Sequence, residues 1–228
     1  MKLTYIITVY NEIKTVKRAI EQVIGIKYKN KEIIVIDNGS TDGSQKIIKK
    51  FKKIKKILRK KDLGIGKSME EGFKKATGDF IFIQYSDLEY DYKRSIFMMN
   101  YAIKNNSDIV LGSRLKNKKN SMLNIIIKKP AYLATIICTF LINIFYNKQF
   151  TDIIGAKLYK KSATLKIPIN SYRYGFDFEF LSRACKKKLK INEVSIRYKP
   201  RKKNSEKKIK FYHMFNALYE IFKVKFFE

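Results

Sequence analysis

The sequence predicts an α/β domain, a mostly parallel β-sheet flanked by helices. Short apolar runs alternate with helical segments of about 10–15 residues through the first half of the chain, the pattern of β-α-β units. The 228 residues suffice to bury a core, and a hydrophobic content of 45% excludes wholesale disorder. Because strands joined by crossover helices run in the same direction, we expect most of the sheet to be parallel.

Apolar runs indicate the strands, and amphipathic stretches indicate the helices between them. The expected strands are residues 3–9, 32–37, 55–59, 79–84, 107–111, 153–159 and 191–198. The expected helices are residues 12–24, a segment that ends at 51 and is capped by Asp42 or Ser44, then 64–76, 93–104, 131–146, 174–187 and 207–227. We expect one domain over residues 1–228, with halves at 1–114 and 115–206 and a C-terminal helix in 207–228.

The charge balance favours anionic partners. Fifty basic residues against 20 acidic ones give a net charge of +30, and most of the basic residues are lysine. The abundance of Lys, Ile, Asn, Tyr and Phe is typical of an AT-rich coding sequence, so we assign about half of the excess to composition. The remainder suits nucleotide phosphates or lipid headgroups. Scarce arginine and the absence of a known nucleic-acid-binding module argue against a specific nucleic-acid partner.

Cysteine and histidine chemistry is limited. Cys138 and Cys185 are far apart and outside any motif, which predicts neither a disulfide framework nor a zinc site. The one histidine, His213, lies in the basic tail, so a histidine metal site or a His-dependent triad is not expected. The N-terminal apolar run is short and ends at Asn11-Glu12, so we expect no signal peptide.

Two segments of the second half suggest contact with a membrane. Residues 131–146 carry no charge, but a helix of that length spans about 24 Å, short of the roughly 30 Å hydrocarbon core. A buried helix, a membrane-spanning helix and a helix in the membrane interface all remain open, and we favour the last. Residues 207–227 form a basic amphipathic pattern that fits either a helix docked on the domain or a membrane-surface anchor. Its aromatic and aliphatic positions are Phe211, Phe215, Leu218, Phe222 and Phe226.

Polar residues follow three predicted strands where a parallel sheet binds ligands. Asp37 ends the second strand and can accept hydrogen bonds from a base or ribose, while the first strand delivers Tyr10-Asn11-Glu12 to the same edge. The fourth strand delivers Asp87 and Glu89, which face the same way in an extended stretch. Hard oxygen ligands of this kind suit Mg²⁺ or Mn²⁺ bridging a diphosphate.

The order of the motifs is more specific than any one of them. ITVYNE, VIDNGSTDGS, the segment from DLGIGKS to IQYSDLEYD, and GSR follow one another in the first half. TDIIGAKLYKK, YGFDFEFLSRACKKKLKINEVSIRYKPR and SEKKIKFYHMFNALYEIFKVKF follow in the second. Together they resemble glycosyltransferase family 2 enzymes with the Rossmann-like GT-A fold, in particular the dolichyl-phosphate mannose synthase and polyprenyl-phosphate sugar synthase group. The resemblance covers nearly the whole chain.

The resemblance implies a nucleotide-sugar site in residues 1–114. The positions that hold base and ribose in such enzymes are Tyr10, Asn11, Glu12 and Asp37. Asp87 falls on the second acid of the family's metal- and diphosphate-binding Asp-x-Asp motif, and Glu89 on the following polar ligand. The implied cofactor is Mg²⁺ or Mn²⁺ at Asp87 and Glu89.

The resemblance likewise implies an acceptor site in residues 115–206. Arg114 and Arg201 match basic positions that face the acceptor phosphate, and Asp152, Asp177 and Glu179 match acidic positions on the acceptor side. The helix at 131–146 corresponds to the interfacial helices with which relatives meet the lipid.

Three positions depart from the family pattern. Tyr85 replaces the first acid of Asp-x-Asp, and a neutral phenol is a poor ligand for a hard cation. Thr8 replaces the usual proline, and Asn38 replaces the second acid after the second strand. A degenerate, non-catalytic relative is therefore one alternative.

The expected reaction is transfer of a hexose from a nucleoside-diphosphate sugar to a dolichyl or polyprenyl phosphate, with inversion. A phosphate is already an anionic nucleophile, so a strong general base is not required. We expect catalysis to depend on Asp87, Arg114, Arg201 and Asp177. A polysaccharide or glycan acceptor is the second alternative. We expect a peripheral enzyme on the cytoplasmic face of a membrane; the oligomeric state stays open.

Overall fold

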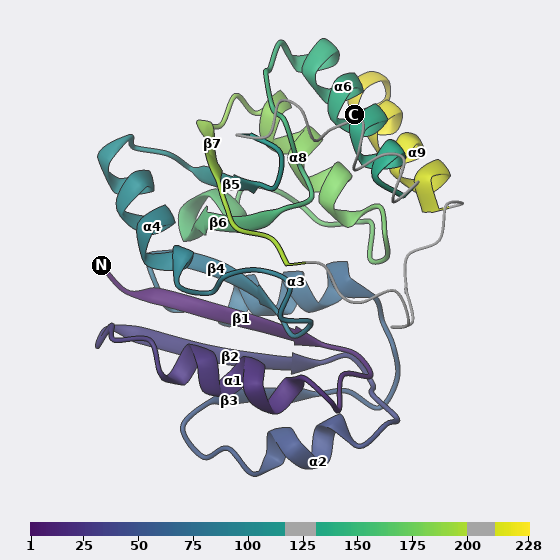
Figure 1. Ribbon diagram of the computed structural model, residues 1–228. Coiled ribbons are helices and arrows are strands. Elements are labelled where there is room, and N and C mark those ends of the chain that lie inside the picture. The colour runs from purple at the N-terminus through teal and green to yellow at the C-terminus, as the bar shows by residue number, and fades with distance from the viewer. Residues whose placement is uncertain (117–130, 200–212) are drawn as a thin grey trace.

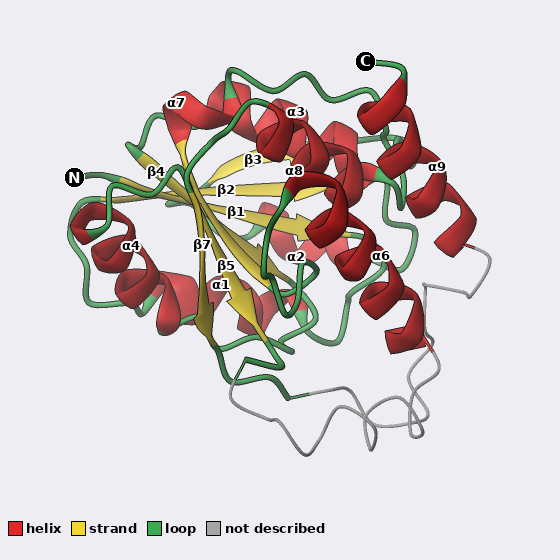
Figure 2. Ribbon diagram, turned by 90° about the horizontal axis from the view of Figure 1, so that it is seen from above, coloured by secondary structure: helices red, strands yellow, loops and turns green. Residues whose placement is uncertain are grey.

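The computed structural model describes residues 1–116, 131–199 and 213–228 (Figure 1). It contains one seven-stranded sheet in the order β3-β2-β1-β4-β6-β5-β7, in which only β6 runs antiparallel to its neighbours. Helices cover both faces of the sheet (Figure 2). The predicted mostly parallel α/β sheet is therefore confirmed.

The first half alternates strands and helices as its sequence pattern predicts. Its elements are β1 Leu3–Val9, α1 Val16–Ile24, β2 Lys31–Asp37, α2 Ser44–Lys49, β3 Lys55–Leu58, α3 Ile65–Lys75, β4 Phe80–Tyr85, α4 Arg94–Lys104 and β5 Ile109–Ser113. Those of the second half are α6 Ala131–Tyr146, β6 Ala156–Lys160, α7 Lys161–Thr164, α8 Phe176–Lys186, β7 Ile191–Ser195 and α9 His213–Phe226.

Two cores lie on opposite faces of the sheet, because alternate residues of each strand point to opposite sides. In β4, Ile81 and Ile83 join the core beneath α3, α8, α6 and α9, whereas Phe80 and Phe82 join the core beneath α1, α2 and α4. The central strands β1 and β4 are buried on both faces, which explains why their sequences are nearly continuous apolar runs.

Several boundaries differ from those predicted because side chains bond the backbone locally. Helix α1 begins at Val16 rather than at residue 12, since Asn11 adopts a φ of 50° and the Ile13 N–H is bound by Asp42 at 2.8 Å. Strand β6 begins at Ala156 rather than at residue 153, and the short helix α7 was not predicted. A Cβ on Gly155 would lie 1.8 Å from the Gly112 carbonyl oxygen, so only glycine lets this turn approach β5.

Helices α6 and α9 lie side by side at one end of the molecule (Figures 1 and 2). Cys138 and Ile142 of α6 and Ala217, Ile221 and Val224 of α9 are buried. The C-terminal helix thus docks on the domain as one alternative predicted, although its inward face is not the aromatic one. Among the described residues, no helix combines the length and apolar character needed to cross a membrane.

Candidate active site

The carboxyl ends of β2, β1 and β4 bring the predicted donor residues to one edge of the sheet. Val9 pairs with Asp37, and Thr8 pairs with Tyr85, so the segments after the three strands are neighbours. Two bonds tie these segments together: the Asn38 N–H donates to the Val9 carbonyl at 2.8 Å, and the Ser86 hydroxyl donates to the Thr8 carbonyl at 2.8 Å.

Asp37 is fully buried at the end of β2. Its Oδ1 accepts the N–H groups of Gly39 and Ser40 at 3.1 and 2.9 Å and the Gln45 amide at 2.6 Å. Its Oδ2 is also buried and has no hydrogen-bond partner among the described residues. A buried carboxylate oxygen without a partner is costly, so it marks a place where a donor of a ligand would be favoured.

The residues after β1 interlock with the turn after β2. The Asn11 N–H donates to the Ser40 hydroxyl at 2.9 Å, and its side-chain oxygen accepts the Thr41 N–H at 2.9 Å. The Glu12 carboxylate accepts the Thr15 hydroxyl at 2.8 Å at the start of α1. Asn11 and Glu12 therefore hold the shape of this edge, while the ring of Tyr10 is exposed.

The end of β4 carries Tyr85, Asp87 and Glu89. Burial raises the pKa of the Tyr85 phenol well above 10, and the nearby carboxylates of Asp177 and Asp87 act in the same direction. Tyr85 is therefore neutral. Asp87 Oδ1 accepts the Glu89 N–H at 3.1 Å, which fixes the turn that places both carboxylates.

Residues distant in sequence connect Glu89 to Arg114. The Tyr198 hydroxyl donates to Glu89 Oε2 at 2.9 Å, and the Arg114 guanidinium lies 5.3 Å from the centre of the Tyr198 ring. Arg114 Nε donates to Asp152 Oδ2 at 2.6 Å and its Nη2 to Oδ1 at 2.8 Å. Asp152 is fully buried, so it does not line a surface as expected but instead holds Arg114.

Asp177 stands at the start of α8 beside this group. Its carboxylate lies 2.9 Å from Lys157 Nζ, a lysine whose side chain is almost wholly buried in β6. The charges of Asp177, Asp87 and Arg114 all act on the phenol of Tyr85, which connects Asp177 electrostatically with the end of β4.

Glu179 is not at the acceptor surface, contrary to the expectation from its motif. It is fully buried, accepts the N–H groups of Asn170 and Ser171 at 3.1 and 2.9 Å, and pairs with Arg183 at 3.1 Å. The loop that it holds packs on the turn before α3, where a Cβ on Gly64 would lie 1.9 Å from the Tyr172 carbonyl oxygen. Glu179 therefore joins the two halves of the chain.

Arg201 lies outside the described residues, so its predicted role stays a prediction. No group of three or more His, Cys, Asp or Glu side chains placed for a metal ion occurs in the described part of the chain. Asp87 and Glu89 would thus be two protein ligands of an ion that completes its shell with ligand and water oxygens.

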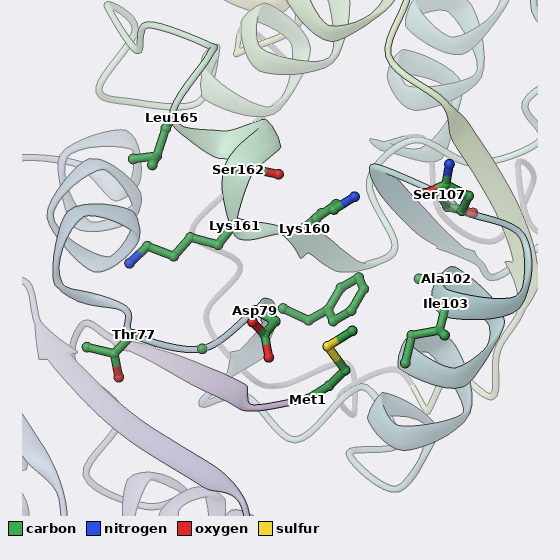
Figure 3. Close-up of a pocket in the computed structure, with 13 residues that line it drawn as sticks. Met1, Thr77, Asp79, Ala102, Ile103, Ser107, Lys160, Lys161, Ser162 and Leu165 are labelled. Carbon is green, nitrogen blue, oxygen red and sulfur yellow. The ribbon is translucent and has the colours of Figure 1, made fainter.

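A separate pocket lies at the other end of the strands, where β4 begins (Figure 3). Its lining includes Phe80 at the start of β4, Lys160 at the end of β6 and Ile103 near the end of α4. Because β4 begins here and ends at Tyr85, the pocket is remote from the residues described above.

Comparison with known proteins identifies the family. Residues 4–167 match the family described as glycosyl transferase family 2. The chain belongs to that family. The match includes β1 to β6, and so it spans the donor residues, Arg114 and Asp152. The resemblance inferred from the sequence is confirmed, and with it the prediction of a glycosyltransferase.

Two relatives of this family 2 transferase act on lipid phosphates, as their names state. The UDP-N-acetylglucosamine–dolichyl-phosphate N-acetylglucosaminyltransferase of Methanococcus voltae is 29% identical over 218 residues, which cover 86% of this chain and 85% of that protein. The dolichol-phosphate mannosyltransferase of Pyrococcus furiosus is 34% identical over 119 residues, which cover 50% of this chain and 33% of that protein.

Solved structures support the GT-A fold of this family 2 transferase. Glucosyl-3-phosphoglycerate synthase from Mycobacterium tuberculosis, in complex with Mn²⁺, uridine diphosphate and phosphoglyceric acid, superposes with a TM-score of 0.72. The alignment covers 100% of this chain and 79% of that chain at 13% identity, so it bears on the fold.

Two residues of this family 2 transferase escaped the sequence analysis. Lys157 is a charged residue at a buried position of β6. A lysine is rarely buried without a partner, so its place in a predicted strand could have indicated a buried ion pair. Glu193, in β7, is buried against the turn that holds Asp152, and nothing in its local sequence indicates that contact.

Proposed function

We propose that this transferase moves a hexose from a nucleoside-diphosphate sugar to a polyprenyl phosphate such as dolichyl phosphate, with inversion. The observation that carries the proposal is the convergence of an acid pair, Asp87 and Glu89, with an arginine fixed by a buried carboxylate, Arg114 and Asp152. Similarity to the dolichyl-phosphate transferase of Methanococcus voltae over most of both chains supports the acceptor.

The donor nucleoside would lie across the ends of β1 and β2. The Oδ2 of Asp37, which has no hydrogen-bond partner among the described residues, suits a hydrogen-bond donor of the base or ribose. The ring of Tyr10, which is 37% exposed, would stack on the base. Asn11 would contribute by holding the turn after β2 rather than by contact alone.

Asp87 and Glu89 would hold a Mg²⁺ or Mn²⁺ ion. Two carboxylates from one turn form a hard oxygen donor set, and they fit an ion that also binds diphosphate oxygens. When bound, such an ion neutralises the charge of the leaving diphosphate. Tyr198 orients the Glu89 carboxylate through its hydroxyl, and the neutral Tyr85 supplies no charge.

Arg114, with Arg201, would receive the acceptor phosphate. The guanidinium offsets phosphate charge and presents N–H donors in a fixed plane, so it can aim the phosphate oxygen at the anomeric carbon. The ion pair with Lys157 would hold the Asp177 carboxylate beside the acceptor phosphate. Attack from the face opposite the diphosphate inverts the anomeric configuration.

Helices α6 and α9 would place the enzyme on a membrane surface, on its cytoplasmic face. Each presents a row of exposed apolar side chains at helical spacing: Leu133, Phe140 and Ile144 on α6, and Phe215, Tyr219, Phe222 and Phe226 on α9. The rows adjoin at Phe145, whose ring centre lies 5.4 and 5.6 Å from those of Phe222 and Phe226. Two neighbouring rows of exposed apolar side chains on a strongly basic protein suit an anionic lipid interface. We call these seven side chains the aromatic face.

The test is a transfer assay in which nucleotide sugars are offered with prenyl phosphates and products are identified by mass spectrometry. Asp87→Asn is expected to lower metal-dependent transfer on the order of 10²-fold or more, since it removes charge at the diphosphate. Asp91→Asn is the matched control, because Asp91 belongs to the same acidic segment but accepts the Lys93 N–H at 3.0 Å in the turn before α4.

Unchanged transfer in Asp87→Asn would remove Asp87 from the mechanism. Transfer to a polysaccharide but never to a prenyl phosphate would replace the acceptor class and leave the donor site as proposed.

A further inference from the structure

The position of Arg114 depends on a turn that lies outside the proposed site. Arg114 makes three bonds to Asp152, through its own N–H at 3.0 Å as well as Nε and Nη2. A planar guanidinium held by two parallel bonds has little freedom, so the orientation of Asp152 determines where Arg114 points. The question is what orients Asp152.

Glu193 of β7 binds the turn that carries Asp152. Its Oε1 accepts the N–H groups of Thr151 and Asp152, both at 2.9 Å, and its Oε2 accepts the Thr151 hydroxyl at 2.8 Å. The Glu193 side chain therefore bonds two successive residues, one of which is the carboxylate partner of Arg114.

The turn is also linked to the residue that precedes Arg114. The hydroxyls of Ser113 and Thr151 are 2.6 Å apart, and Ser113 Oγ accepts the N–H groups of Leu115 and Lys116 at 3.0 and 2.9 Å. Arg114 is thus fixed by its backbone through Ser113 and by its side chain through Asp152. Both routes meet at Thr151, which Glu193 holds.

Burial opposes the ionised form of the Glu193 side chain. It is 8% exposed, and burial raises its pKa even though the N–H groups of Asp152 and Thr151, the Thr151 hydroxyl and Lys116 act in the opposite direction. A buried acid whose side-chain bonds all go to one turn contributes rigidity at that turn.

We infer that Glu193 is a positioning residue for Arg114 and acts through Thr151 and Asp152. The inference rests on the proposed role of Arg114 at the acceptor phosphate. Loosening the turn would let the guanidinium shift, and displacement of an aiming group by about 1 Å can cost up to about 10²-fold in rate.

The chain offers a matched control in Glu32. Like Glu193 it is 8% exposed, lies in a strand and accepts a threonine hydroxyl, that of Thr4. It accepts one backbone N–H, that of Thr77, where Glu193 accepts two, and it also pairs with Lys55 at 2.5 Å. It lies near the start of β2, whereas Arg114 follows the end of the parallel strand β5, so the two residues lie at opposite ends of the strands. Glu32→Gln and Glu193→Gln therefore both alter a buried strand carboxylate that binds a turn, and only the second lies next to the proposed acceptor site.

The kinetic test compares these two variants. Glu193→Gln is expected to lower kcat/KM for prenyl phosphate about tenfold or more and to leave the KM for the nucleotide sugar unchanged. In an Arg114→Ala background, Glu193→Gln is expected to have no further effect, because the group that it positions is gone. Glu32→Gln is expected to lower the free energy of unfolding but not to lower kcat/KM for prenyl phosphate selectively. Additive losses from Glu193→Gln and Arg114→Ala would overturn the inference.

A spectroscopic test does not depend on the acceptor. In ¹⁵N-labelled full-length protein, the Arg114 Nε–H signal is assigned by its loss in Arg114→Lys. It is expected to shift and to exchange faster with solvent in Glu193→Gln but not in Glu32→Gln. An unchanged signal in Glu193→Gln would overturn the inference. If the signal changes while the wild type transfers no sugar to prenyl phosphate, the positioning link stands and the proposed acceptor fails.

Discussion

At the scale of single residues, Tyr85 determines how much charge the proposed metal site carries. Burial raises the pKa of the Tyr85 phenol well above its usual value of 10, and the carboxylates of Asp177 and Asp87 act in the same direction, so the phenol is protonated near neutral pH. A protonated phenol is a weak ligand for a hard cation. The ion would therefore be held by Asp87, Glu89 and the donor diphosphate, with one negative charge fewer than in the family's Asp-x-Asp motif.

Tyr85→Phe tests whether that oxygen matters. We expect the Mn²⁺ concentration that gives half-maximal transfer to change by less than about threefold, because the phenol supplies no ligand charge. Tyr90→Phe is the control for loss of a tyrosine hydroxyl, because Tyr90 is half-buried and its ring centre is 5.9 Å from that of Tyr85. A rise of tenfold or more in Tyr85→Phe alone would show that the Tyr85 oxygen binds the ion.

At the scale of elements, Glu32 shows how one carboxylate joins strand ends. It lies in β2, accepts the Thr4 hydroxyl of β1 at 2.7 Å and the Thr77 N–H at 2.8 Å, and pairs with Lys55 of β3 at 2.5 Å. Burial alone would raise the pKa of Glu32, but these three partners outweigh burial and lower it to about 2. The contacts therefore stabilise the sheet while Glu32 is ionised.

The pH dependence of unfolding should report this carboxylate. Since the pKa is lower in the folded than in the unfolded chain, the contribution is present above about pH 4.5 and is lost as the pH falls toward 2. It amounts to at most about 3 kcal/mol in the free energy of unfolding, because solvent screens part of the attraction to the exposed Lys55. In denaturant titrations, the free energy of unfolding of Glu32→Gln is expected to fall less than that of the wild type between these pH values. The exposed Glu21→Gln is the control, and an equally steep loss in Glu32→Gln would contradict the assignment.

The elements were predictable to different degrees. Apolar periodicity located each strand of the sheet, and the order of strands placed Asp37 and Asp87 at one edge. The start of α1 and the turn before β6 were not predictable, because bonds such as Asp42 to the Ile13 N–H override helix and strand propensity. The pairing of Arg114 with Asp152 depends on long-range insertion of an antiparallel strand, which no local pattern encodes.

The aromatic pattern of the C-terminal helix illustrates a second limit. Periodicity indicated a face at Phe215, Phe222 and Phe226, but α9 has two apolar faces, and the smaller side chains of Ala217 and Ile221 face the core. Which face packs inward depends on the shape of α6 and α8, to which α9 docks. The sequence therefore predicted the helix but not its orientation.

At the scale of the whole molecule, membrane attachment would combine charge with aromatic burial. The net charge of +30 attracts anionic lipid over a distance that salt shortens, whereas the aromatic face acts only on contact. Phe140 and Phe215 are 61% and 63% exposed, which leaves much of their apolar area available to lipid. Salt and substitution should thus separate the two contributions.

Phe140→Ser combined with Phe215→Ser is expected to lower binding to anionic vesicles by more than about tenfold, because about 2 kcal/mol or more of apolar burial is lost. Wild-type binding should weaken at about 0.5 M salt but persist, since aromatic burial is not screened. Co-sedimentation measures both, and thermal unfolding should be unchanged because the two rings are exposed. Phe97→Ser, an exposed phenylalanine on α4, is the control. If the double variant binds like the wild type and salt removes all binding, attachment is purely electrostatic and the aromatic face is not the lipid-binding surface.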